Sequence, residues 1–206
     1  MDISLIQPRP LSVLENGTRP VFRAGLEWWR QNDGVIRTDD EVRAILRHMQ
    51  LSVVEQIGVT PPYLHVGEKS LAARVWGDDW AIASAGLPGL PDEEFDKIIT
   101  DEYGECVIEK KPFMHTVIAP LDHPKHGECV IHYDRLLMPV RFPSGITLVG
   151  SLQFLRSLVV LKGTEYLVGT STPANHQDSR WDVQSSGIRM VHSDGSLRAR
   201  GTQTSR

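Results

Sequence analysis

A cluster of side chains that could bind a metal ion lies between residues 122 and 129. Two histidines and a cysteine have the spacing His-x2-His-x2-Cys, at His123, His126 and Cys129, between Asp122 and Glu128. Imidazole, thiolate and carboxylate groups together suit a borderline metal such as zinc. A structural zinc site normally has four converging ligands, and the chain has no second paired motif. The alternative is a solvated hairpin loop, and we expect no metal site here.

A second group of residues could carry acid–base chemistry. His115, His132 and Asp134 alternate along segments that we expect to be neighbouring strands. A carboxylate beside an imidazole can orient that ring as a general base, so a small α+β enzyme is one functional alternative. However, the chain has no G-x-S-x-G nucleophile turn, and Cys106 follows acidic residues that favour a raised thiol pKa. We therefore expect structural histidines and no catalytic residues.

The composition excludes several classes of partner. The chain has 206 residues, 40% hydrophobic and 23% charged, with a net charge of -4. This charge does not indicate a basic face for nucleic acid, and no run approaches the roughly 18 apolar residues of a membrane span. The N-terminus lacks the pattern of a secretory signal, and two cysteines make no disulfide framework. We expect a cytoplasmic protein with reduced thiols.

Several helices are predicted by periodicity and by their caps. Residues 19–31 place Phe22, Leu26 and Trp29 on one face, and Asn32-Asp33-Gly34 ends that helix. A second helix is expected to begin at Thr38, because Thr38 and Glu41 have the spacing of a capping box. Asp92 is expected to cap a third helix. Residues 1–18 are interpreted as a leader that packs loosely or not at all.

Period-2 segments separated by turns predict an antiparallel meander. The strands are expected at 113–119, 129–142 and 146–154, with Pro143-Ser144-Gly145 between the last two. A short strand is expected at 63–66. Periodicity does not decide whether residues 51–55 and 70–76 form helix or strand. From Ser171 onward the chain is polar, which is typical of a flexible tail.

The segment from Lys111 to Phe154 resembles the last strands of PAS domains. The sequence YDRLLMPV is followed by a glycine-containing turn and LVG. This segment is similar to one in a bacterial single-PAS family, in which RLLLPL precedes a turn and a final strand. Upstream, 22–29 with its WW pair, 37–55 and 63–76 resemble the leading helix, the entry to the first strand and the strand before the core helices. The resemblance covers Phe22 to about Val160 and implies fold more than activity.

This resemblance implies an α+β fold, with a PAS-like antiparallel sheet, flanking helices and an N-terminal helical extension. The expected division is a leader at 1–18, the extension at 19–60, the PAS-like domain at 61–170 and the tail at 171–206. Helices between 76 and 99 would cover one sheet face and could leave a cavity. The residues expected to line it are Trp76, Trp80, Phe95, Met114, His115, Tyr133 and Met138.

The occupant of that cavity is left open by the sequence. It is either a small apolar ligand or ordinary core side chains. A flavin photosensor is not expected, because neither cysteine lies in an Asn-Cys-Arg-Phe-Leu-type segment. Haem stays an alternative, since a lone histidine can be an axial ligand. The sequence itself requires no cofactor.

The leading helix carries a wide apolar face formed by Phe22, Leu26, Trp28 and Trp29. The adjacent tryptophans point about 100° apart, so both are hard to bury against one surface. We expect either a partner or dimer contact there, or packing of Trp28 against a neighbouring loop. Together with the resemblance, this indicates an intracellular sensory or regulatory module that acts on other signalling proteins or on a second copy.

Overall fold

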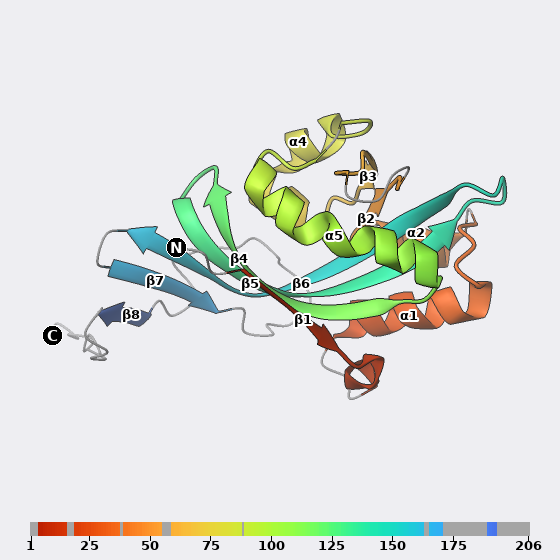
Figure 1. The fold of residues 1–206 in the computed structure, drawn as a ribbon, viewed down its shortest axis with the longest axis horizontal. Helices are drawn as coiled ribbons and strands as arrows, with labels where there is room; N and C mark the ends of the chain where they lie inside the picture. Colours follow the sequence, from red (N-terminus) through yellow and green to blue (C-terminus); the bar gives the residue numbers. More distant parts are fainter. Residues whose placement is uncertain are drawn as a thin grey trace, which may run out of the picture.

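The chain folds as one antiparallel sheet with helices on both faces (Figure 1). The computed structural model describes residues 4–15, 19–37, 39–54, 59–87, 89–162, 165–170 and 189–192. Six strands lie in the order β1-β4-β5-β6-β2-β3, while β7 (Glu165–Thr170) pairs with β6 and β8 (Arg189–His192) pairs with β7. The mixed α+β class expected from the sequence is therefore confirmed.

The predicted meander is the centre of the sheet. Strands β4 (Phe113–His123), β5 (Gly127–Arg141) and β6 (Thr147–Lys162) pair in sequence order, and each is longer than its alternating pattern indicated. Gly127 and Gly145 have φ of 70° and 94° at the two connecting turns, a region that favours glycine. A bulge between His132 and Tyr133 bends β5.

Two further strands extend the sheet beyond β6. The segment around residue 51, which periodicity left open, is strand β2 (Met49–Ser52), and it pairs with both β6 and β3 (Tyr63–Val66). The short strand predicted at 63–66 is thus confirmed. Residues Met49–Ser52 of the expected 19–60 extension therefore belong to the main sheet.

The expectation of a loosely packed leader is wrong for its described residues. Strand β1 (Leu5–Arg9) pairs with the free edge of β4 along five residues. A 3-10 helix, η1 (Leu11–Leu14), follows, and Leu14 is buried at 3% exposure. The leader is ordered because it pairs with a strand that is distant in the sequence. The local sequence around its two prolines does not indicate this pairing.

Helices α1 (Pro20–Asn32) and α2 (Asp40–Leu46) cover one face of the sheet. Asp33 ends α1 in the left-handed conformation, as the turn signal predicted. The cap of α2 differs from the prediction: Asp39 accepts a hydrogen bond from the Val42 amide, and Thr38 lies outside the described residues. The capping box was therefore assigned one residue too early.

The expected partner face on α1 is instead core. Phe22, Leu26 and Trp28 are at most 4% exposed and pack on the sheet. Trp29 is half-buried, and its indole N–H donates to the Pro139 carbonyl at 2.6 Å. Trp28 is buried in the core between α1 and the sheet, whereas Trp29 reaches the backbone of β5 at Pro139, so the two rings meet different surfaces.

Three helices cover the opposite face: α3 (Leu71–Trp76), α4 (Asp78–Ala83) and α5 (Glu93–Glu109). Ser70 caps α3, which settles the open segment at 70–76 as helix, and Asp92 caps α5 as predicted through the Phe95 amide at 2.9 Å. In Figure 1, α5 runs over the sheet face opposite to α1.

No helix within the described ranges is long and apolar enough to cross a lipid bilayer. Most of the predicted tail, residues 171–188 and 193–206, lies outside the described residues.

Candidate functional site

A small cavity lies between α3, α5 and the sheet. Its volume is about 20 Å³, which is room for a single water molecule. Most of its wall is aliphatic and aromatic, and two carboxamides, Gln50 and Gln153, supply its polar part. The lining residues are Gln50, Leu71, Ala72, Val75, Trp76, Leu90, Phe95, Ile99, Ile131, Tyr133 and Gln153.

Four of the seven residues predicted to line a pocket gather at this cavity. Trp76, Phe95 and Tyr133 line it, and Trp80 packs on Trp76 with ring centroids 5.5 Å apart. Trp76 also contacts Phe95, and Phe95 contacts Tyr133, so the rings form a chain from the half-buried tryptophans to the sheet. We call Trp76 and Trp80 the aromatic lid.

The other three predicted residues are not at the cavity. Met114 and Met138 pack with α1 on the opposite face of the sheet. His115 is on the α5 side, where it stacks on Phe113 with ring centroids 6.1 Å apart. Adjacent strand residues point to opposite faces, so Met114 and His115 cannot line one pocket, and the joint prediction was wrong on this point.

A row of polar side chains crosses the sheet under α5. His115, Arg135 and Gln153 are in direct register on β4, β5 and β6, and we call them the polar row. His115 Nδ1, Arg135 Nε and Gln153 Oε1 are buried atoms without a hydrogen-bond partner among the residues that the structure describes. Buried polar atoms in native proteins are nearly always paired, so three such atoms in register make this row a candidate for the polar part of a site.

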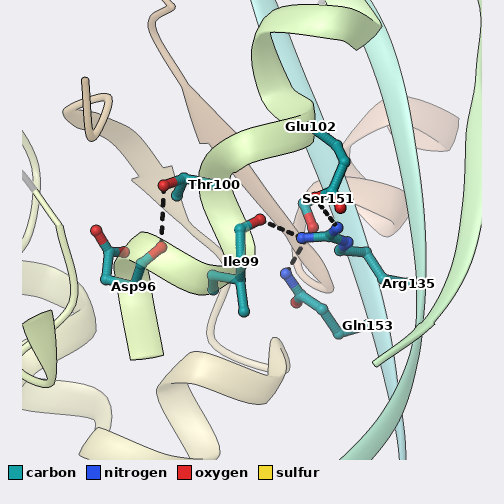
Figure 2. Close-up of polar contacts among 7 residues, drawn as sticks. All are labelled: Asp96, Ile99, Thr100, Glu102, Arg135, Ser151 and Gln153. Atoms are coloured by element: carbon teal, nitrogen blue, oxygen red, sulfur yellow. Dashed lines mark hydrogen bonds and ion pairs between the residues drawn. The ribbon is translucent and has the colours of Figure 1, made fainter. Parts of the chain in front are cut away.

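Arg135 fastens α5 to the sheet (Figure 2). Its guanidinium donates to the Ile99 carbonyl in the middle of α5 and to Glu102 at 2.7 Å, and it lies 5.8 Å from the centre of the Tyr103 ring. Beside it, the Gln153 amide donates to Ser151 at 2.7 Å and to Gln50. The charge of Arg135 is thereby balanced by a single carboxylate.

His115 is neutral in this setting. Burial, and then the nearby Arg135 guanidinium, lower the pKa of His115 from 6.5 to about 4. The pKa values of His48 and His123 are also lowered to about 4, mainly by burial. The unfolded chain therefore takes up protons below about pH 6.5 that the folded chain accepts only near pH 4.

We therefore expect the stabilisation by neutral histidine to be complete above about pH 6.5. The free energy of unfolding should then fall as the pH drops toward 4. Replacement of His115 by phenylalanine keeps a ring on Phe113 and removes one of these protons. The difference in unfolding free energy between neutral and mildly acidic buffer, measured by urea titration, should be smaller in His115→Phe than in the wild type. Equal differences would contradict this account of His115.

The acid–base group considered as an alternative is not assembled. His115 faces α5, whereas Asp134, its diagonal neighbour across β4 and β5, faces α1, where its contacts among the described residues are with Thr116, Arg156 and Arg19. The pKa of His132 is lowered by burial and by Arg156, with Asp134 acting in the opposite direction. No imidazole–carboxylate pair is therefore formed by these three residues.

Asp134 instead organises a buried ion cluster under the start of α1. The carboxylate is fully buried; it accepts from the Thr116 hydroxyl at 2.9 Å and from Arg156 at 2.8 Å, and it pairs with Arg19. Arg19 directly precedes α1, so this carboxylate ties the helix to β4, β5 and β6. Asp134 stands between Tyr133 and Arg135, whose side chains point to the cavity face.

The segment with the spacing His-x2-His-x2-Cys is a hairpin turn. The rings of His123 and His126 are 4.5 Å apart, while the Cys129 thiol contacts the Gly127 carbonyl. In the described ranges, no three histidine, cysteine or acidic residues are placed to hold an ion. Burial raises the pKa of Cys129 to about 11 and that of Cys106 to about 12; the acidic neighbour Glu105 contributes to the latter, in the direction expected.

Sequence reasoning missed Arg135, Gln50, Gln153 and Ser151. One signal for Arg135 was available in the sequence. Arg135 is a charged residue in a predicted strand, directly before the apolar Leu136 and Leu137. The two glutamines carry no such signal, because only the strand register brings them together. Comparisons of the chain with protein-family models, with curated proteins and with solved structures found no match. The functional interpretation therefore rests on the residues themselves.

Proposed function

We propose that the protein is a PAS-like sensory or regulatory module that binds a small molecule under α3 and α5 and acts through other proteins. The observation that supports this most is the polar row, whose member Gln153 lines the aromatic cavity and has an unpartnered Oε1. A pocket with mostly apolar walls and a few fixed polar groups is typical of small-molecule sites.

The same groups define the chemistry of the ligand. A flat apolar part fits against Trp76 and Phe95, and a hydrogen-bond donor fits Gln153 Oε1. The ligand is uncharged, because Glu102 already balances the only buried cation of the row. This differs from the purely apolar ligand expected at first, since an apolar molecule would leave the row unsatisfied.

Binding requires the cavity to open. The aromatic lid is half-buried, and Gly77 between α3 and α4 has φ of 97° and ψ of 163°, a conformation for glycine. Outward movement of α3 about Gly77 would enlarge the cavity without breaking a strand pair. The ligand would then select the open form from the existing conformations.

The PAS-like part of the proposal is supported by the order of elements. The meander is intact, and the helices that would cover the sheet face follow β3 and precede β4, as the resemblance implied. Two free, buried cysteines fit a cytoplasmic location. The partner is another signalling protein or a second copy of the chain.

Transmission to the far face would pass through β5. Tyr133 and Arg135 meet the cavity side, and Asp134 between them binds Arg19 at the start of α1. A change in β5 would therefore alter the packing of α1 without contact between ligand and helix. Two discrete arrangements of Asp134 and Arg19 would form the switch.

Gln153→Leu tests the ligand site. We expect planar heteroaromatic amides, screened by thermal shift, to stabilise the wild type and to lose about tenfold or more in affinity with this variant, because one fixed acceptor is removed. Gln31→Leu, on the exposed surface of α1, is the matched control and should bind like the wild type. Equal binding by both variants would contradict the proposed site.

A further inference from the structure

A second groove lies beside α2. Its volume is about 460 Å³, and it is bounded by α2, by β3 and by the loop between β3 and α3. Arg43 lies on α2 and Arg47 is the C-cap of that helix one turn later; the other lining residues are Leu46, His65, Gly67 and Glu68. Two further positively charged residues lie nearby: Lys69 is in the loop before α3, and Arg74 is on α3. We call this surface the basic groove.

The groove has a rigid base. The His65 imidazole contacts the Leu46 carbonyl at 2.9 Å, and the amides of Gly67 and Lys69 donate to the carbonyls of Met49 and Arg47. A Cβ at Gly67 would lie 2.3 Å from the Leu46 oxygen, so only glycine allows the two loops to approach this closely. The cationic side chains therefore project from a fixed backbone.

Two arginines and one glutamate line the groove, although the chain carries a net charge of -4. The pKa of His48, beside the groove, is lowered to about 4 by burial and then by Lys69, Arg74 and Arg47, with Glu68 acting in the opposite direction. The acidic neighbours are weakly held: Asp40, paired with Arg43, is 97% exposed, and Glu68, paired with Arg47, is 59% exposed. Exposed pairs of this kind contribute little, so another carboxylate can replace them.

We propose that the basic groove binds an acidic segment of a partner protein, with carboxylates on Arg43 and Arg47 and an aliphatic side chain on Leu46. Guanidinium groups pair with carboxylates through two parallel hydrogen bonds, and Leu46 supplies an apolar contact between them. A peptide is favoured over nucleic acid, because the four cations are interspersed with acids and the chain is negative as a whole.

The position of the groove gives this contact a consequence. Helix α3 carries Arg74 on the groove side, while Leu71, Ala72, Val75 and Trp76 line the cavity. Opening of the cavity would shift Arg74 relative to Arg43 and Arg47. The inference rests on the proposed function only for this link, and peptide binding to the groove is measurable with the cavity empty.

The test is fluorescence anisotropy with a labelled peptide of alternating glutamate and leucine. We expect saturable binding by the full chain, weakened about fivefold when NaCl is raised from about 50 to about 300 mM. Arg43→Glu/Arg47→Glu should weaken binding about tenfold or more, and Arg43→Gln/Arg47→Gln by less. The control Arg23→Glu changes an exposed arginine on α1 and should bind like the wild type.

Three outcomes would overturn the inference. They are the absence of peptide binding, equal binding by the double variants and the wild type, and tighter binding of inorganic phosphate or of a labelled oligothymidine than of the peptide. A thermal melt of each variant establishes folding, and none of the substituted side chains is buried. Loss of ligand binding in Gln153→Leu with intact peptide binding would separate the two sites.

Discussion

Replacement of Asp134 by alanine is expected to lower the free energy of unfolding by about 3–5 kcal/mol. The carboxylate is fully buried and is bound by Thr116, Arg156 and Arg19. Its removal leaves two guanidinium groups facing each other, and the Arg19 side chain is only 13% exposed. Breaking a buried network of hydrogen bonds and ion pairs is among the few causes of so large a loss. Urea unfolding followed by circular dichroism measures the change.

Asp33→Asn is the control for this prediction, because asparagine removes the charge and still tolerates the left-handed backbone of Asp33. Asp33 also pairs with an arginine, Arg141, but the two side chains are 81% and 48% exposed. The expected loss is about 1 kcal/mol or less. Amide exchange in the first turn of α1 should also accelerate in Asp134→Ala and stay unchanged in Asp33→Asn. Similar losses in the two variants would show that the buried cluster does not hold α1.

The second large effect is expected on the other face of β5. Glu102→Ala removes the carboxylate that pairs with Arg135, whose side chain is 1% exposed. We expect a loss of about 3 kcal/mol, at the lower end of the range for a broken buried pair because Glu102 is itself 22% exposed. Glu105→Ala, on the exposed side of the same helix, should change stability by less than about 0.5 kcal/mol.

A compensating substitution separates charge from packing. Arg135→Met/Glu102→Ala fills the same space with an apolar side chain and removes the buried charge. It should recover most of the stability lost in Glu102→Ala, because buried ion pairs are often replaceable by apolar residues of similar volume. A double variant as unstable as Glu102→Ala would mean that Arg135 acts through its hydrogen bond to Ile99 rather than through its charge.

Local features were the most predictable part of this fold. The end of α1 and the cap of α5 depend on neighbours within one turn of helix, and Asp33 and Asp92 occupy the expected places. The meander was predictable because alternation and the Pro143-Ser144-Gly145 turn act over a few residues. Strand β1 was not, since its partner β4 is more than a hundred residues away and Leu5–Arg9 contains no alternating pattern.

The candidate site was only partly predictable for a related reason. Aromatic residues near α3 and α5 could be assigned to a cavity, and Trp76 and Phe95 do line it. The face of each strand residue could not be assigned, because a shift of one residue exchanges the faces, and Met114 was therefore placed on the wrong side. The polar row depends on register across three strands, which no single segment contains.

Native mass spectrometry of the protein purified from the organism that encodes it tests the central claim most directly. The native mass of the wild type is expected to exceed the denatured mass by that of a small uncharged molecule, and Gln153→Leu should lack this difference. A wild-type native mass equal to that of the chain alone, or an identical extra mass in both proteins, would contradict a ligand site at the polar row.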